Sequence, residues 1–238
     1  HKTYFVERIT TNSSKTDLEY AVNVKDILEI YNIHPGQIEG AILSSVVPPL
    51  NSTILQAVEK ILGKRPLLVG SGMKTGLNII MDNPKTVGSD MIVDAVAAIH
   101  EYPKPIVVID MGTATTMSVV DKAGNYIGGV ILPGLKVSLD SLSGKTAQLP
   151  YISLSTPDKV IGKNTIDCMR SGIIYGNAAQ IDGIMDRMEA ELGEKASAVA
   201  TGGLAKFITP LCRHHIVYDD ALLLKGLLIL YRKNTQHH

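Results

Sequence analysis

A run of apolar residues that ends in an aspartate is the first segment with the residue types for phosphate chemistry. Val107 to Ile109 lead into Asp110-Met111-Gly112-Thr113-Ala114-Thr115-Thr116. A glycine lets backbone N–H groups approach phosphate oxygens, threonine hydroxyls add donors, and a carboxylate can hold a cation or its water shell. An ordinary hairpin turn with an exposed aspartate fits the same residues. Three threonines in the four residues after the glycine favour phosphate binding.

Two other segments fit this chemistry less specifically. In Ala200-Thr201-Gly202-Gly203, a strand end runs into glycines ahead of a helix start, where bare backbone can lie against a nucleotide. Such glycine pairs are also common as simple connections. Asp90 stands directly before an apolar helical pattern that starts at Met91. It fits a helix cap, which stabilises a helix by about 1 kcal/mol, and equally a base that accepts the proton of an attacking hydroxyl.

The histidines and cysteines give no metal or disulfide pattern. His214-His215 stand near Asp219-Asp220, and we interpret this stretch as a solvated surface loop, so we predict no zinc site. Cys168 and Cys212 lie outside any CxxC or Cys/His spacing. We therefore expect two reduced, partly buried thiols.

The elements that must position these residues alternate between helical and strand-like patterns, which indicates an α/β fold. The first half is expected to hold helices at 17–31, 54–62 and 91–100, with Asp17 as candidate cap of the first, and short strands at 41–47 and 67–69. After the proline-rich break at 102–105, strands at 106–109, 116–120 and 126–131 predict a three-stranded antiparallel meander. Helix dominates from about Thr165, with a strand near 198–200 and a last helix at 221–232.

The composition excludes several classes of partner. The 238 residues include 23 basic and 23 acidic side chains, so the formal net charge is zero and gives no footprint for nucleic acid or an anionic membrane. No segment approaches 18 uninterrupted apolar residues, and the first residues lack the pattern of a signal peptide. We expect a cytoplasmic protein with no membrane or nucleic-acid partner.

Seven segments, taken together, resemble type III pantothenate kinases, and their order and separations match across nearly the whole chain. They are Gly88-Ser89-Asp90, Asp110 to Thr116, Gly128-Gly129 with Pro133-Gly134, Thr146-Ala147-Gln148-Leu149-Pro150, Ile161-Gly162-Lys163-Asn164-Thr165, Ser171-Gly172 with Tyr175-Gly176, and Ala200-Thr201-Gly202-Gly203. One such segment would be weak evidence, whereas seven in register are specific at the level of a family.

The resemblance implies the fold of the superfamily that contains acetate and sugar kinases, Hsp70 and actin. That fold has two actin-like (ribonuclease H-like) subdomains with mixed sheets flanked by helices, which we expect at 1–104 and 105–238, with the last helix packing back on the N-terminal one. The resemblance also implies a homodimer with its active site near the subunit interface. Its members use ATP with Mg²⁺ and a monovalent cation (K⁺ or NH₄⁺) to phosphorylate pantothenate to 4'-phosphopantothenate, the first step of coenzyme A biosynthesis.

Carried over by position, the resemblance assigns a role to each site residue. Asp90 matches the general base, which favours catalysis over capping alone, and Asp110 matches the monovalent-cation ligand. The expected pantothenate contacts are Met81, Gly88, Ser89, Asp90, Met91 and, across the dimer, Thr165. The expected ATP contacts are Gly112, Thr113, Thr115, Gly202 and Gly203.

Three features depart from the family pattern. The family opens with a strand and an Asp-x-Gly-Asn-Thr loop that contacts ATP phosphates, whereas this chain starts at the segment that follows, so as written it should bind ATP poorly. Met91 stands where arginine is usual, and such a lost contact costs about 2 to 3 kcal/mol of substrate binding. Met81 replaces a common tyrosine and Lys145 a common arginine. The alternative function is a non-catalytic or altered-substrate paralogue that binds nucleotide as a regulatory or accessory protein.

Overall fold

The structure, a computed structural model, describes residues 2–236, and these divide into two compact units. The first unit holds residues 2–75, 88–90 and 227–236, and the second holds residues 76–87 and 91–226. Each unit has its own hydrophobic core, so each is described by itself.

The first unit is built on two packed helices, α1 (Asp17–Ile30) and α2 (Asn51–Leu62), beside the short parallel strands β1 (Ile42–Leu43) and β2 (Leu67–Leu68). The cap of α1 is Thr16, because its Oγ1 accepts from Glu19 N at 3.3 Å while Glu19 Oε2 accepts from Thr16 N at 2.7 Å. The expected cap, Asp17, is therefore wrong by one residue and lies in the first turn instead. This reciprocal pairing satisfies backbone donors that a helix start otherwise leaves unpaired.

A six-stranded mixed sheet forms the centre of the second unit, in the order β3-β6-β5-β4-β7-β8. The predicted meander is confirmed: β4 (Ile106–Met111), β5 (Ala114–Val120) and β6 (Asn125–Pro133) pair antiparallel. The predicted strand near 198–200 is β7 (Ser197–Thr201), which pairs parallel with β4 and with β8 (Ile216–Tyr218). The strand β3 (Asn78–Ile79) pairs parallel with the start of β6.

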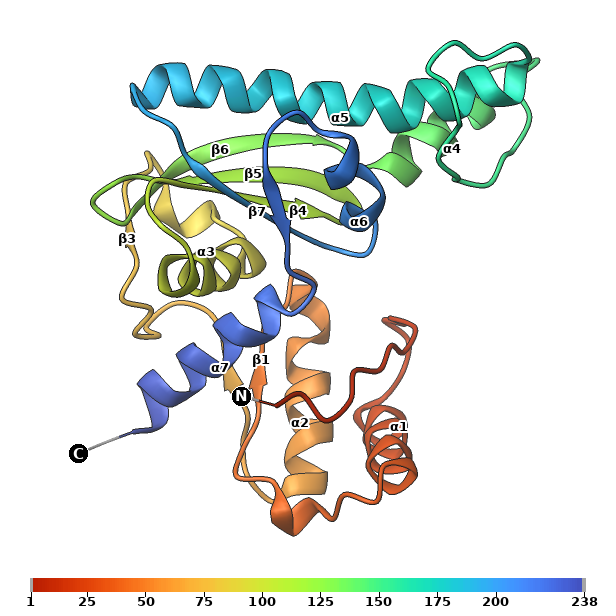
Figure 1. The fold of residues 1–238 in the computed structure, drawn as a ribbon. Coiled ribbons are helices and arrows are strands. Elements are labelled where there is room, and N and C mark those ends of the chain that lie inside the picture. Colours follow the sequence, from red (N-terminus) through yellow and green to blue (C-terminus); the bar gives the residue numbers. More distant parts are fainter. Residues whose placement is uncertain (1, 237–238) are drawn as a thin grey trace. The chain divides into compact units, whose positions relative to one another are not determined.

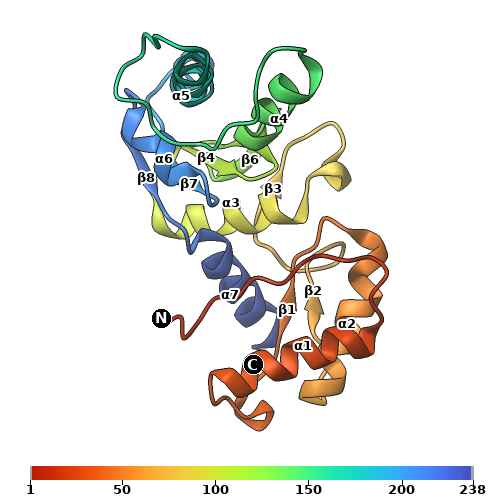
Figure 2. The same ribbon diagram turned by 90° about the vertical axis from the view of Figure 1, so that its right-hand side faces the viewer.

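Helices cover both faces of this sheet, as Figures 1 and 2 show. Val107, Ile109 and Met111 face α4 (Leu135–Lys145), the long α5 (Thr165–Leu192) and the short α6 (Ala205–Ile208), whereas Ile106 and Val108 face α3 (Ser89–Glu101). Continuous apolar character along β4 is typical of a strand buried on both faces. The predicted class, a mixed sheet flanked by helices, is confirmed.

Two predicted helix boundaries need correction, and the last helix has defined partners. α3 begins at Ser89, so Asp90 lies inside its first turn and is not the residue before the helix. α1 ends at Ile30, one residue before its predicted end at 31. The last helix, α7 (Leu222–Thr235), is held in its final turn by Asn234, whose Oδ1 accepts from Lys74 N at 2.9 Å.

No helix within residues 2–236 combines the length and the apolar content that a bilayer requires.

Candidate active site

The ends of three neighbouring strands of the second unit bring Asp110 between two threonines. Asp110 of β4 lies directly opposite Thr116 of β5 and beside Thr201 of β7 in the register of the sheet. Residues paired in this way point to the same face of a sheet. The structure therefore unites the two segments that the sequence singled out for phosphate chemistry, although about ninety residues separate them.

Gly202 lies so close to the end of β4 that no other residue type fits. Its φ is +93°, and a Cβ at this position would be 2.6 Å from the carbonyl oxygen of Met111 and 2.9 Å from Oδ1 of Asp110. Side chains avoid both the conformation and the contact. The absence of a side chain therefore leaves the backbone after β7 directly against the Asp110 carboxylate, with Gly203 exposed beyond it.

The turn between β4 and β5 is exposed, and backbone hydrogen bonds hold it in place. Gly112 N donates to Ala114 O at 3.0 Å, and Gly134 N donates to Thr113 O at 3.2 Å. A Cβ on Gly134 would be 2.3 Å from that same Thr113 oxygen, so this position also requires glycine. Gly112 and Thr113 are therefore fixed in place yet open to solvent, which suits contact with a phosphate group.

The side chain of Thr115 lies on the face of the sheet opposite to that of Asp110. It pairs with Met111 and packs on the opposite face of the sheet, where it is 1% exposed and its Oγ1 has no hydrogen-bond partner among the described residues. Its hydroxyl is not presented beside Asp110, so a contact of Thr115 with a phosphate would have to come from its backbone. The threonine of β5 on the Asp110 face is Thr116.

In the first unit, hydrogen bonds tie the start of α3 to the residues that follow β1. Ser44 Oγ donates to Ser89 Oγ at 3.0 Å, and Ser89 Oγ donates to the backbone oxygen of Ser45 at 3.0 Å. Asp90 comes next, half-buried in the first turn of α3. Backbone N–H groups in a first turn lack helical partners and stabilise a negative charge. Ser89 thus fixes the segment that carries the predicted base.

The two methionines of the predicted substrate pocket have different surroundings. Met91 is half-buried and packs against the core between the sheet and α3. Met81 follows β3, is 36% exposed, and lies over a bulge of β6 where Gly128 has a φ of +131°. A Cβ on Gly128 would lie 3.4 Å from Met81 Sδ.

Thr165 is the first residue of α5, and it is exposed. It follows the cap of that helix, Asn164, whose Oδ1 accepts from Asp167 N at 2.9 Å.

Comparison with known proteins identifies the family of the chain. A family model described as type III pantothenate kinase matches residues 2–187. The chain belongs to the type III pantothenate kinase family. A protein named type III pantothenate kinase from Exiguobacterium sp. (strain ATCC BAA-1283 / AT1b) is 46% identical over 229 residues, which cover 96% of this chain and 90% of that relative. A solved Baf family protein from Campylobacter jejuni shares the fold, with a TM-score of 0.58 at 19% identity over 89% of this chain and 88% of its own.

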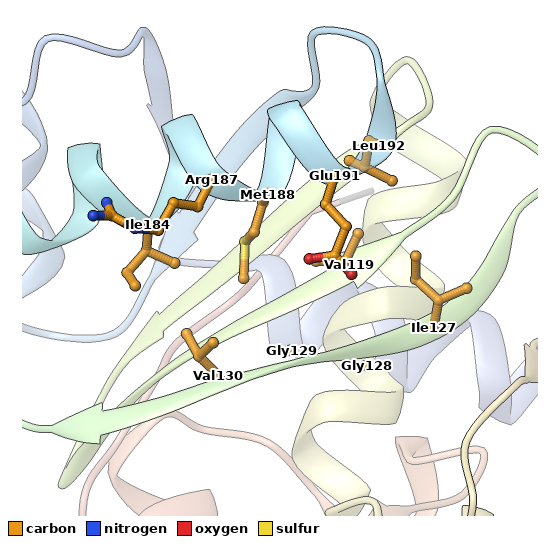
Figure 3. Close-up of a pocket in the computed structure, with 10 residues that line it drawn as sticks. All are labelled: Val119, Ile127, Gly128, Gly129, Val130, Ile184, Arg187, Met188, Glu191 and Leu192. Carbon is orange, nitrogen blue, oxygen red and sulfur yellow. The ribbon is translucent and has the colours of Figure 1, made fainter.

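A cavity of about 380 Å³ lies between α5 and the strands β5 and β6 of this kinase family member (Figure 3). Val119 and Val130 line it from the sheet and Ile184 and Met188 from α5. None of the residues predicted to contact ATP or pantothenate, all of which the structure describes, lines it. Gly128, beside which Met81 lies, also lines this cavity.

Sequence reasoning missed the contacts of His214 with the carboxylates of α5. His214 is only 15% exposed, and its Nδ1 lies 3.0 Å from Asp182 Oδ1, so its interpretation as part of a solvated loop is wrong. Its neighbour in the sequence, Asp219, instead accepts from Lys225 Nζ at 2.7 Å and from the Tyr102 hydroxyl at 3.1 Å. The spacing of Asp182, Asp186 and Glu189 places them on one face of α5, but the sequence does not show that His214 contacts this face.

The two cysteines also differ from each other. Both are free thiols, but Cys168 is exposed, so the prediction of partial burial is wrong for it. Cys212 is half-buried, and burial followed by the negative charge of Asp182 raises the pKa of its thiol to about 12. Cys212 is therefore a neutral thiol at physiological pH, which makes it unreactive as a nucleophile.

Proposed function

We propose that the chain catalyses the ATP-dependent phosphorylation of pantothenate to 4'-phosphopantothenate, the first step of coenzyme A biosynthesis. The match of the family over most of the chain carries this conclusion, and the 46% identical relative bears the same name over nearly the same length. The backbone of Gly202 beside the carboxylate of Asp110 supports it, because the fold allows only glycine here and so leaves bare backbone next to that carboxylate.

Gly112, Thr113, Gly202 and Gly203 are proposed to contact ATP, with Thr115 contributing its backbone. The exposed backbone of Gly112 and Gly203, near the carboxylate of Asp110, supports contact with a phosphate group and its accompanying cation. Kinases of this family use a divalent ion with ATP. We propose Asp110 as ligand of the monovalent cation, K⁺ or NH₄⁺. When bound, the cations offset the charge of the phosphates.

Asp90 is proposed as the general base. Its carboxylate accepts the proton of the primary hydroxyl of pantothenate while that oxygen attacks the γ-phosphorus, the bond to the bridging oxygen breaks, and ADP leaves. The hydrogen bonds of Ser89 to Ser44 and Ser45 support this role because they fix the turn that carries Asp90. Pre-organisation of this kind accounts for much of the rate enhancement in phosphoryl transfer.

Gly88, Ser89 and Met91 are proposed to contact pantothenate together with Met81. Both methionines offer apolar surface where the family commonly places tyrosine and arginine, so the substrate is held with fewer charged hydrogen bonds. We further propose a cytoplasmic homodimer in which Thr165 of one subunit contacts the substrate of the other. The exposure of Thr165 at the start of α5 supports this. The division at residue 104 into two actin-like subdomains is likewise a proposal.

A steady-state assay of ADP release tests this function. The full chain is mixed with ATP and Mg²⁺, with and without pantothenate, in buffers that contain K⁺, NH₄⁺ or only Na⁺. We expect ADP release that requires pantothenate and rises with K⁺ or NH₄⁺. Nucleotide binding by calorimetry without pantothenate affinity or turnover would instead indicate an accessory protein and would overturn the proposal.

A further inference from the structure

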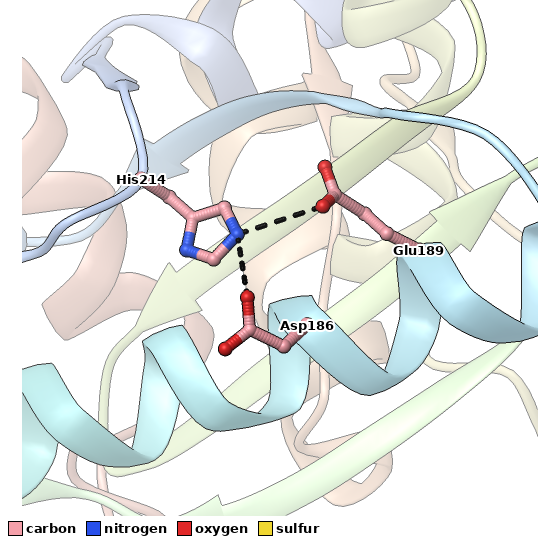
Figure 4. Close-up of side chains that lie close together, drawn as sticks. All are labelled: Asp186, Glu189 and His214. Carbon is pink, nitrogen blue, oxygen red and sulfur yellow. Dashed lines mark ion pairs between the residues drawn. The ribbon is translucent and has the colours of Figure 1, made fainter.

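Three side chains with metal-binding donor atoms converge at one end of α5 (Figure 4). His214 Nε2 lies 3.3 Å from Asp186 Oδ1 and 3.6 Å from Glu189 Oε2. All three donor atoms lie within 4.8 Å of one another. Asp186 and Glu189 are one helical turn apart, whereas His214 comes from the segment that leads into β8. We call these three residues the His214 cluster.

A fourth residue orients the imidazole. Asp182 Oδ1 lies 3.0 Å from His214 Nδ1, and both oxygens of this buried carboxylate accept from Arg213 N, at 3.0 and 2.9 Å. A neutral imidazole that donates from Nδ1 to Asp182 has its free lone pair on Nε2, between the other two carboxylates. Histidines that bind metals usually have their second nitrogen hydrogen-bonded to a carboxylate or carbonyl in this way.

The two distances from the imidazole nitrogen to the carboxylate oxygens fit a tetrahedral ion. Zinc binds nitrogen and oxygen at about 2.0 to 2.2 Å, so two donors of a tetrahedral site lie roughly 3.3 to 3.6 Å apart. The distances of 3.3 and 3.6 Å from Nε2 match this spacing. They are also longer than the usual N–H···O hydrogen bond of about 2.9 Å. The fourth ligand would be water, because Asp186 is half-exposed.

Two cationic side chains now contact these acids, and both can turn away. Lys195 Nζ contacts Glu189 Oε2, and Arg213 contacts Asp186 Oδ2 at 3.0 Å and Asp182 Oδ2 at 3.5 Å. Lys195 is 85% and Arg213 72% exposed, so either side chain can move into water. The carboxylates of Asp182 and Glu189 are buried and fixed by backbone N–H groups, including Ala196 N. Three acids against two cations leave negative charge for an incoming ion.

We propose that Asp186, Glu189 and His214 bind a divalent transition-metal ion, zinc foremost, which joins α5 to the segment before β8. Imidazole combined with carboxylates suits zinc, whereas magnesium prefers an all-oxygen octahedral set. The site is distinct from the proposed kinase residues of the second unit, because Glu189 bonds Ala196 before the start of β7 and Asp110 pairs with Thr201 at its end. The ion has a structural role and takes no part in phosphoryl transfer.

Titration of the chelator-treated full chain with ZnCl₂ in a calorimeter, with Mg²⁺ in excess, tests this proposal. Replacing His237 and His238 by alanine in every sample removes the terminal histidines as competing ligands. We expect one zinc ion per chain, an affinity at least tenfold weaker in His214→Ala and in Asp186→Asn, and an unchanged affinity in the matched control His215→Ala. Asp186→Asn guards against misfolding because its side chain is half-exposed.

Two further readouts decide the same question. Zinc should raise the melting temperature of the parent chain and not that of Asp186→Asn, because an ion that binds the folded state alone stabilises it. Cobalt at one equivalent should give the intense visible absorption of a four-coordinate ion in the parent chain only. Absence of zinc binding, or equal affinity in the parent, His214→Ala and Asp186→Asn, would overturn the proposal.

Discussion

Carboxylates from neighbouring elements lie near both ends of β7, and their surroundings differ in burial and hydrogen bonding. At the end of the strand, Asp110 lies beside the bare backbone of Gly202 and the exposed turn at Gly112 and Thr113. At its start, Asp182 and Glu189 are buried and accept hydrogen bonds from backbone N–H groups. The comparison teaches that glycine and an exposed turn leave the first carboxylate open to its surroundings, whereas burial and hydrogen bonding hold the other two in place. Changes at the first end should reduce turnover, and changes at the second should reduce stability.

Among changes at the two ends of β7, the largest effect is expected from Asp110→Asn. The amide keeps the shape of the side chain but removes the negative charge proposed to hold a monovalent cation, so kcat/KM should fall about 100-fold, as when one charge-stabilising group of an active site is lost. Rates measured with increasing K⁺ should show that the variant no longer responds to the ion. Full activation by K⁺ in Asp110→Asn would contradict this role.

Gly202→Ala should have a smaller effect, which combines a loss of stability with a higher KM for ATP. The added methyl group would overlap Met111 O and Asp110 Oδ1, and a φ of +93° costs a non-glycine residue about 1 to 3 kcal/mol. We expect a lower free energy of unfolding by urea denaturation and a rise of about tenfold in the KM for ATP. An unchanged KM with lower stability would remove Gly202 from the ATP site.

At the other end of β7, Asp182→Asn should cost about 1 to 3 kcal/mol of stability at pH 7, because buried donors lose their charged acceptor. Burial alone would raise the pKa of Asp182, but hydrogen bonds from Arg213 N and His214 outweigh it, so the pKa lies below the ordinary 3.8. The pKa of Glu189 is likewise below 4.5, because hydrogen bonds from Lys195 and Ala196 outweigh burial.

The sign of the pH dependence follows from these two shifts. A carboxylate with a lower pKa in the folded state stabilises the protein above its unfolded pKa and loses that contribution as pH falls through the folded value. Unfolding free energies measured from pH 7 down to pH 3 should therefore decline below about pH 4.5. The decline should be shallower in Asp182→Asn, whose kcat at pH 7 should match the parent. An identical pH profile in both proteins would contradict the assignment.

The smallest change in stability is expected from Gly172→Ala. This substitution also serves as the control for Gly202→Ala. Gly172 is exposed within α5, and a Cβ there meets no atom within 4 Å. Alanine should stabilise the helix by up to about 1 kcal/mol, because glycine has the lower helix propensity. The melting temperature should rise slightly while the KM for ATP stays constant. A loss of stability would show that contacts beyond one chain occupy this surface.

The sequence singled out the residues at the Asp110 end of β7, and not those at the other end, for a physical reason. Asp110, Gly112 and Gly202 belong to short contiguous segments in which strand, turn and glycine are neighbours along the chain. Thr115 was expected among the ATP contacts, and the face that its side chain takes depends on the register of the hairpin. In the structure Thr115 pairs with Met111, and this register turns the Thr115 side chain into the core.

The His214 cluster was beyond sequence reasoning because its members meet only through the tertiary fold. Asp219 is closer to His214 along the chain than Asp182 is, but Asp219 turns toward Lys225. The cap of α1 illustrates a smaller error of the same origin, since Thr16 and Asp17 are both good capping residues and only the backbone conformation decides between them. Local patterns predict elements well, whereas pairings across long sequence separations depend on packing.

The central claim, phosphoryl transfer to pantothenate with Asp90 as base, is tested most directly by identifying the product. Phosphorus NMR of the full chain with ATP, Mg²⁺, K⁺ and pantothenate should show the phosphomonoester resonance of 4'-phosphopantothenate growing as ATP is consumed. The folded Asp90→Asn variant should form it at a rate lower by about 100-fold or more. ATP consumption without that resonance, or an equal rate in Asp90→Asn, would contradict the account.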